Sequence, residues 1–148
     1  ENLYLLKLDM MNQLDVAAEE KLRECRKTLD AFAGNPEVLN SLSWMMMDRL
    51  RFGTWSAKIA YEAARRAVEL APQDIRPVKK AYYLATLARA SHSIGRLSDA
   101  VARQEEAVKL IKGEPEERGM AELLNFYIEA AGLQGGGGRT PGKSEAGN

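Results

Sequence analysis

Three segments of this chain carry the same pattern of small and apolar residues at helical spacing. The pattern occupies positions i, i+4 and i+7, and it recurs about every 40 residues, as Ala18-Leu22-Cys25, Ala60-Ala64-Ala67 and Ala100-Gln104-Ala107. A repeat of this length is typical of stacked helical hairpins, in which no hairpin can bury its apolar face without its neighbour. The sequence therefore predicts an all-α fold built as a stack of antiparallel helix pairs.

Chain breakers divide this repeat into elements. Three hairpins are predicted over residues 2–33, 36–72 and 77–112, with a closing helix over 116–132. Glycine stops the helices, and Asn35-Pro36 opens one, since proline is tolerated in a first helical turn. Asp15, Thr54 or Ser56, and Ser98 are the expected caps of three further helices.

The apolar spacing predicts which residues share a face. Residues 2–14 read as a helix with Leu3, Leu6, Met10 and Leu14 on one side, although the short run 3–8 also fits a strand. The helix over about 36–51 is expected to bury the residues Leu39, Leu42 or Ser43, Trp44 and Met47. Residues 1–132 thus form the expected helical domain.

Residues 133–148 lose the apolar pattern. This segment contains four consecutive glycines followed by small or polar residues, so a flexible tail is expected. The stretch from Gly137 to Ser144 satisfies the phosphate-loop expression G-x-x-x-x-G-K-[ST]. That motif requires a strand before the loop and a helix after it, and neither is predicted here, so we expect no nucleotide binding.

Composition excludes several classes of function. With 148 residues, of which 45% are hydrophobic, the chain can form its own core. Its 21 basic and 21 acidic residues leave no basic excess for binding nucleic acid. No apolar run approaches the roughly 18–20 residues of a membrane span. The chain begins at Glu1 without a methionine or a signal pattern, which suggests a piece of a longer polypeptide.

Residues 44–72 and 84–112 resemble the tetratricopeptide repeat. The matching positions are Trp44, Met47, Ala60, Ala67 and Pro72 in the first copy, and Leu84, Leu87, Ala88, Gly95, Ala100 and Ala107 in the second. The resemblance implies a right-handed α-α superhelix, or solenoid, whose concave groove binds a protein or peptide. The chain departs from the family pattern at Asp48, Arg51, Trp55 and Ser91, and its period is longer than the family's 34 or so residues.

A narrower likeness suggests an alternative function. Residues 39–44, 67–71, 84–90, 104–108 and 122–127 are similar to the C-terminal helical part of bacterial proteins that join a thioredoxin-like domain to such repeats. This resemblance implies a non-catalytic accessory segment, soluble in the bacterial cytoplasm or periplasm, with an upstream redox domain as its partner. The chain itself has no Cys-x-x-Cys. A homo-oligomerisation module, associating through exposed methionine and aromatic residues, is a second alternative.

Arg49 and Arg89 are the leading candidates for partner binding. They lie 40 residues apart at the same phase of consecutive repeats, and in the tetratricopeptide family that phase faces the groove. With Met45, Tyr82 and His92 they would form a basic, aromatic-edged surface for an acidic or C-terminal peptide, because guanidinium groups bind carboxylates in a bidentate manner. The alternative is that both arginines are ordinary solvated residues paired with nearby acids.

The remaining reactive side chains indicate structure rather than chemistry. His92 is the only histidine and Cys25 the only cysteine, so neither has the neighbours that a metal site or a nucleophilic pair requires. Cys25 is expected to be a buried, inert thiol. Met47 is expected in the core, with Met45 and Met46 partly exposed. We therefore expect no enzyme activity, metal or cofactor.

Overall fold

The fold is all-helical in the part of the chain that the structure, a computed structural model, describes: residues 2–14, 16–48 and 54–132. Its helices are α1 (Asn2–Gln13), α2 (Ala18–Ala31), α3 (Pro36–Asp48), α4 (Thr54–Glu69), α5 (Pro77–Ser93), α6 (Leu97–Leu110) and α7 (Glu117–Ala130). The all-α prediction is confirmed, and the segment that also fitted a strand is the helix α1.

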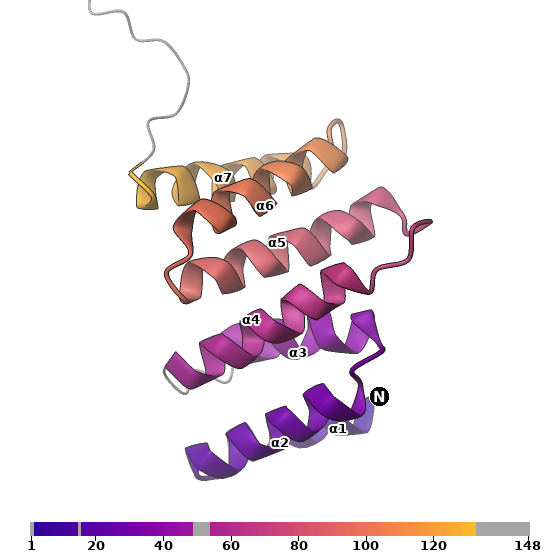
Figure 1. The fold of residues 1–148 in the computed structure, drawn as a ribbon, viewed down its shortest axis with the longest axis vertical. Coiled ribbons are helices and arrows are strands. Elements are labelled where there is room, and N and C mark those ends of the chain that lie inside the picture. Colours follow the sequence, from indigo (N-terminus) through magenta and orange to yellow (C-terminus); the bar gives the residue numbers. More distant parts are fainter. Residues whose placement is uncertain (1, 15, 49–53, 133–148) are drawn as a thin grey trace, which may run out of the picture.

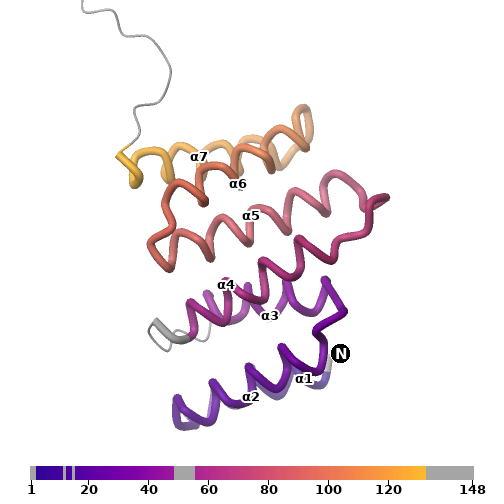
Figure 2. Tube along the Cα trace, in the orientation of Figure 1, coloured from indigo at the N-terminus to yellow at the C-terminus, as the bar shows by residue number. Residues whose placement is uncertain are grey.

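Successive helices lie side by side along the long axis of the molecule, with α1 and α2 at one end and α6 and α7 at the other (Figure 1). The trace in Figure 2 shows the same order from indigo to yellow. Helix α3 packs on α4, α5 packs on α6, and α4 joins the two pairs by packing on α5. Helix α3 also contacts α5 directly. None of the helices in the described ranges has the length and apolar character needed to cross a bilayer.

Local signals set the helix ends. The Oδ1 atom of Asn35 accepts hydrogen bonds from the backbone N–H groups of Glu37 and Val38, both at 3.1 Å, so the predicted start of α3 is confirmed. Gly95, with a φ of 79°, terminates α5 in the left-handed region. The prediction that Ser98 caps α6 is wrong, because α6 begins one residue earlier, at Leu97.

The repeated stripe is buried in two of its three copies. Its six members on α4 and α6 have no exposed surface: Ala60, Ala64, Ala67, Ala100, Gln104 and Ala107. In the α2 copy Cys25 is fully buried, but Leu22 is only partly buried and Ala18 is exposed. The small side chains therefore bring α4 and α6 close to their neighbours, whereas α2 is less enclosed.

Enlarging these alanines should destabilise the protein. Ala67→Leu and Ala107→Leu each insert three carbon atoms into a filled contact, so we expect a loss of about 1–3 kcal/mol in the free energy of unfolding, measured by urea denaturation. Ala102, which is exposed on α6, offers the matched control. Ala102→Leu should change stability by less than about 0.5 kcal/mol. Equal effects at all three positions would contradict the close approach of the helices.

The structure corrects two expectations about burial on α3. Trp44 is 49% exposed, so its predicted burial is wrong, whereas Leu42 and Ser43, the two predicted alternatives, are both fully buried. Met46 is 1% exposed rather than partly open, whereas Met47 lies in the core as predicted. The face of α3 that meets the core is therefore rotated relative to the predicted one, which leaves the indole at the surface.

Helix α1 is apolar on two faces. Its predicted stripe of Leu3, Leu6 and Met10 is exposed by half or more, while Leu8 and Met11 on the other side are buried. Contacts with α2 hold the helix, and Tyr4 makes an edge-on contact with Phe32, the residue that follows α2. Periodicity identified an apolar face of α1, but the opposite face is the one that packs on the core.

An ion pair also joins α1 to α2. The Glu24 carboxylate accepts from the Nζ atoms of Lys7 at 2.6 Å and Lys27 at 2.7 Å, and these ammonium groups lower the pKa of Glu24 to about 2. Because the pKa of Glu24 is depressed, the stability that its ion pairs contribute is present at neutral pH and is lost as pH falls from about 4.5 towards 2. Glu24→Gln should therefore speed amide exchange in α1 at pH 7, and exchange rates that equal the wild type would contradict this.

Candidate partner-binding groove

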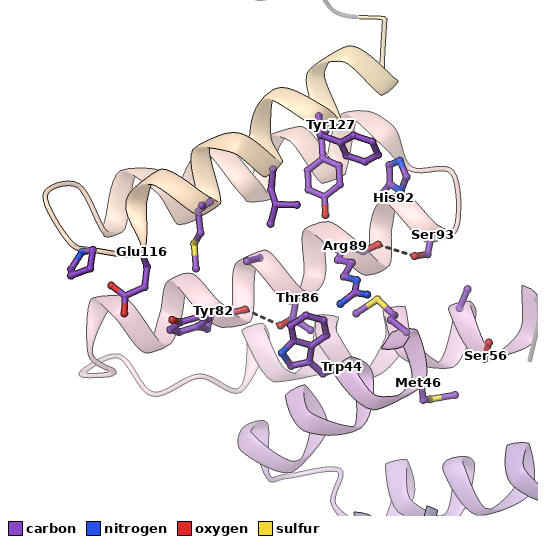
Figure 3. Close-up of a pocket in the computed structure, with 18 residues that line it drawn as sticks. Trp44, Met46, Ser56, Tyr82, Thr86, Arg89, His92, Ser93, Glu116 and Tyr127 are labelled. Atoms are coloured by element: carbon purple, nitrogen blue, oxygen red, sulfur yellow. Dashed lines mark hydrogen bonds between the residues drawn. The ribbon is translucent and has the colours of Figure 1, made fainter. Parts of the chain in front are cut away.

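A groove with a volume of about 900 Å³ lies along α3, α5 and α7 and reaches the start of α4 (Figure 3). Its lining is mainly apolar and aromatic. The residues are Trp44, Met46, Met47, Ser56, Ala57, Tyr82, Ala85, Thr86, Arg89, His92, Ser93, Pro115, Glu116, Gly119, Met120, Leu123, Phe126 and Tyr127.

Helix α5 is central to the groove: one of its faces lines the groove and another packs in the core. Residues 82, 85, 86, 89, 92 and 93 follow helical spacing and line the groove. Ala81, Leu84 and Ala88 are fully buried among the core clusters on the other side. Because one face fixes α5 in the core, the other can present a rigid surface.

Two hydroxyl groups on the groove face of α5, those of Thr86 and Ser93, are already used within the helix. The Oγ1–H of Thr86 donates to the carbonyl oxygen of Tyr82 at 2.9 Å, and the Oγ–H of Ser93 donates to that of Arg89 at 3.0 Å (Figure 3). These bonds turn both hydroxyls back towards their own backbone. The α5 side of the groove therefore presents methyl groups and rings more than hydrogen-bonding groups.

Arg89 is held by two neighbours on α3. Its guanidinium carbon lies 4.3 Å from the centre of the Trp44 ring, and one guanidinium nitrogen lies 3.3 Å from an Oδ atom of Asp48. A cation over an indole face is favourable, and the carboxylate balances its charge. The sequence left two interpretations of the arginines, a groove site for a carboxylate or ordinary pairing with nearby acids. The ion pair with Asp48 agrees with the second interpretation for Arg89. Arg49 lies outside the described residues, so the paired-guanidinium site stays a prediction.

Aromatic rings close one end of the groove. The centroid of His92 lies 5.3 Å from those of both Phe126 and Tyr127, which joins α5 to α7. Burial raises the pKa of Tyr127, and the nearby charge of Arg89 opposes that shift. Phe126 is half exposed at the rim. This cluster provides a preformed apolar wall.

The structure brings three of the predicted site residues together and separates a fourth. Tyr82, Arg89 and His92 all line the groove. Met45 does not, because it packs, partly buried, against the core cluster that contains Leu39 and Leu42.

Sequence reasoning missed the contribution of α7 and of Trp44. The lining at helical spacing includes Glu116, just before α7, and Gly119, Leu123 and Phe126 on it. Met120 and Tyr127 also line the groove, but they are buried and form a second apolar spacing. Two apolar faces on a closing helix are the signal that could have indicated a surface for binding.

A buried amide positions α7 as a wall of the groove. Gln104 on α6 is fully buried, and its Nε2–H donates to the carbonyl oxygen of Met120 at 2.9 Å. Its Oε1 atom has no hydrogen-bond partner. The same stripe position on α4 is Ala64, so α4 has no equivalent of this polar contact.

The site shows no metal-binding geometry. Among the described residues, no group of histidine, cysteine and acidic side chains is arranged to hold a metal ion. The phosphate-loop expression at 137–144 lies outside those residues.

Comparisons with protein-family models, curated proteins and solved structures found no match to this chain.

Proposed function

We propose that this chain is a protein-interaction module with a tetratricopeptide-like solenoid fold, whose groove binds a segment of a partner protein. The observation that carries the proposal is the convergence of half-exposed apolar side chains on one concave surface. Trp44, Tyr82, Leu123 and Phe126 are each between 45% and 52% exposed, and all four line the groove. Apolar side chains gathered in this way are typical of binding surfaces, whereas isolated ones need no explanation.

The helical-repeat interpretation is supported by the buried small-residue stripes and by the order of helix contacts. Both are properties of solenoids, in which each hairpin contacts only its neighbours and the first helices of the hairpins share one face. Helices α3 and α5, the first members of two predicted hairpins, both contribute to the groove, and the closing helix α7 extends it.

Gly119 allows a direct test of the groove. It lies on the groove face of α7, and a Cβ atom placed there would meet nothing within 4 Å. Gly119→Trp should therefore fill the groove without disturbing the core. Gly119→Ala is the matched control, and it should stabilise the helix by about 0.5–1 kcal/mol.

The experiment is selection of a displayed library of random peptides, about 12 residues long, against the wild-type protein. We expect enriched peptides to bind the wild type and Gly119→Ala, and to bind Gly119→Trp at least about tenfold more weakly. A circular-dichroism melt should show that the tryptophan variant remains folded. Enriched peptides that bind all three proteins equally, or no enrichment at all, would reject the groove as the binding site.

A further inference from the structure

We infer that the groove takes a short amphipathic α-helix, oriented with its N-terminus towards Glu116 and its C-terminus towards Arg89 and His92. This inference rests on the proposed function and specifies the occupant. The family resemblance in the sequence suggested instead an acidic segment bound by paired arginines, so the two ligands differ in both conformation and chemistry.

The groove has the length of a short helix. Its lining at α7 extends from Glu116, just before the helix, to Tyr127, and that on α5 from Tyr82 to Ser93. At 1.5 Å per helical residue each wall is about 16 Å long, which matches about three turns of a bound helix. Ala85 and Gly119 leave space between the larger side chains, so an approaching helix can come close to both walls.

Hydrogen bonding favours a helix over an extended chain. An extended peptide brings its own N–H and C=O groups into the groove, and each would have to be paired there or lose free energy on leaving water. The hydroxyls of Thr86 and Ser93 are bonded to their own helix, and Arg89 is engaged by Trp44 and Asp48. A helix satisfies its backbone internally and presents only side chains. The apolar rings and methyl groups of the groove suit that surface.

The carboxylate of Glu116 sets the direction of the bound helix. Glu116 lies at one end of the groove, and Arg89, whose charge Asp48 balances, lies towards the other (Figure 3). A helix carries a partial positive charge at its N-terminus and a partial negative charge at its C-terminus. The favourable orientation therefore places the N-terminus beside Glu116. Basic residues in the first turn of the ligand would add to this complementarity, because they would lie beside Glu116.

The probes are four fluorescein-labelled peptides of about 14 residues, compared by fluorescence anisotropy. The first has Leu and Phe at i, i+3, i+4 and i+7, a Lys-containing first turn and a Glu-containing last turn. The second exchanges the Lys and Glu residues. The third scrambles the first so that no apolar face remains, and the fourth is an acidic peptide without apolar residues.

We expect the first peptide to bind at least about tenfold more tightly than the scrambled one, and about threefold more tightly than the charge-exchanged one. Binding should be weakened at least about tenfold by Gly119→Trp and be retained by Gly119→Ala. Circular dichroism of the complex should show a gain of helix.

Other outcomes would overturn the inference. Equal binding of the scrambled peptide, or tighter binding of the acidic peptide, would show that the occupant is not an amphipathic helix; if Gly119→Trp still abolished that binding, the proposed function would stand. Self-association that the first peptide displaces would assign the groove to a second copy of this chain. Binding of no peptide, or binding that Gly119→Trp leaves unchanged, would reject both the inference and the proposed function.

Discussion

The thiol of Cys25 should react with Ellman's reagent at about pH 8 at least about a thousandfold more slowly in the folded protein than in the urea-unfolded chain. The side chain is fully buried in the core cluster that also contains Leu39 and Leu42, and burial raises the pKa of Cys25 to about 12. An ordinary thiol has a pKa near 9, and only the thiolate attacks the reagent. At a given pH below the pKa, each unit by which the pKa of the thiol rises lowers the thiolate fraction about tenfold.

The single cysteine makes this measurement unambiguous, because every molecule of product reports on one site. Labelling of the folded protein within about tenfold of the unfolded rate would contradict the burial of Cys25.

The same raised pKa of Cys25 predicts a loss of stability at alkaline pH. The neutral thiol contributes fully below pH 9, and that contribution is lost as pH rises from 9 towards 12. Cys25→Ala should lessen this slope in urea unfolding measured across that pH range.

The elements of the fold could be predicted because their signals are local. Asn35 caps α3 with its own side chain, and Gly95 ends α5 by adopting a positive φ. The small-residue stripes are equally local, since helical spacing alone places Ala60, Ala64 and Ala67 on one face. These three residues are all fully buried.

The choice between two apolar faces could not be predicted in the same way. On α3 the sequence offers Trp44 and Met46 on different sides, and on α1 it offers Leu6 and Leu8. In both helices the second residue of each pair is the buried one. Helical periodicity detects an apolar stripe but says nothing about which neighbour covers it. That depends on contacts between hairpins, which are distant in sequence.

The groove was only partly predictable for a related reason. Arg89 was predicted because its repeat phase faces the groove in the tetratricopeptide family that the sequence resembles, and His92 because it lies near the end of the same helix. Phe126 and Leu123 belong to α7, which has no counterpart at that phase in the repeat pattern, so nothing in the sequence linked them to α5. The link is the contact of His92 with Phe126 and Tyr127, which exists only after α7 has docked on α6.

Docking of α7 should depend on Gln104, and Gln104→Ala is expected to cost about 2–4 kcal/mol in the free energy of unfolding. The substitution removes a fully buried side chain, leaves a cavity between α6 and α7, and breaks the hydrogen bond from Nε2 to the carbonyl oxygen of Met120. Urea denaturation at neutral pH measures the change.

Gln104→Leu separates the effect of volume from that of the hydrogen bond. Leucine fills most of the space, loses the bond to Met120, and removes the buried Oε1 atom that has no partner. Because the lost bond and the removed unpaired oxygen act in opposite directions, we expect Gln104→Leu to cost less than about 1 kcal/mol. If leucine is as damaging as alanine, the hydrogen bond rather than the filled space holds α7. In either case, a variant with a loosened α7 should also bind groove peptides more weakly, because Leu123 and Phe126 reach the groove only from a docked α7.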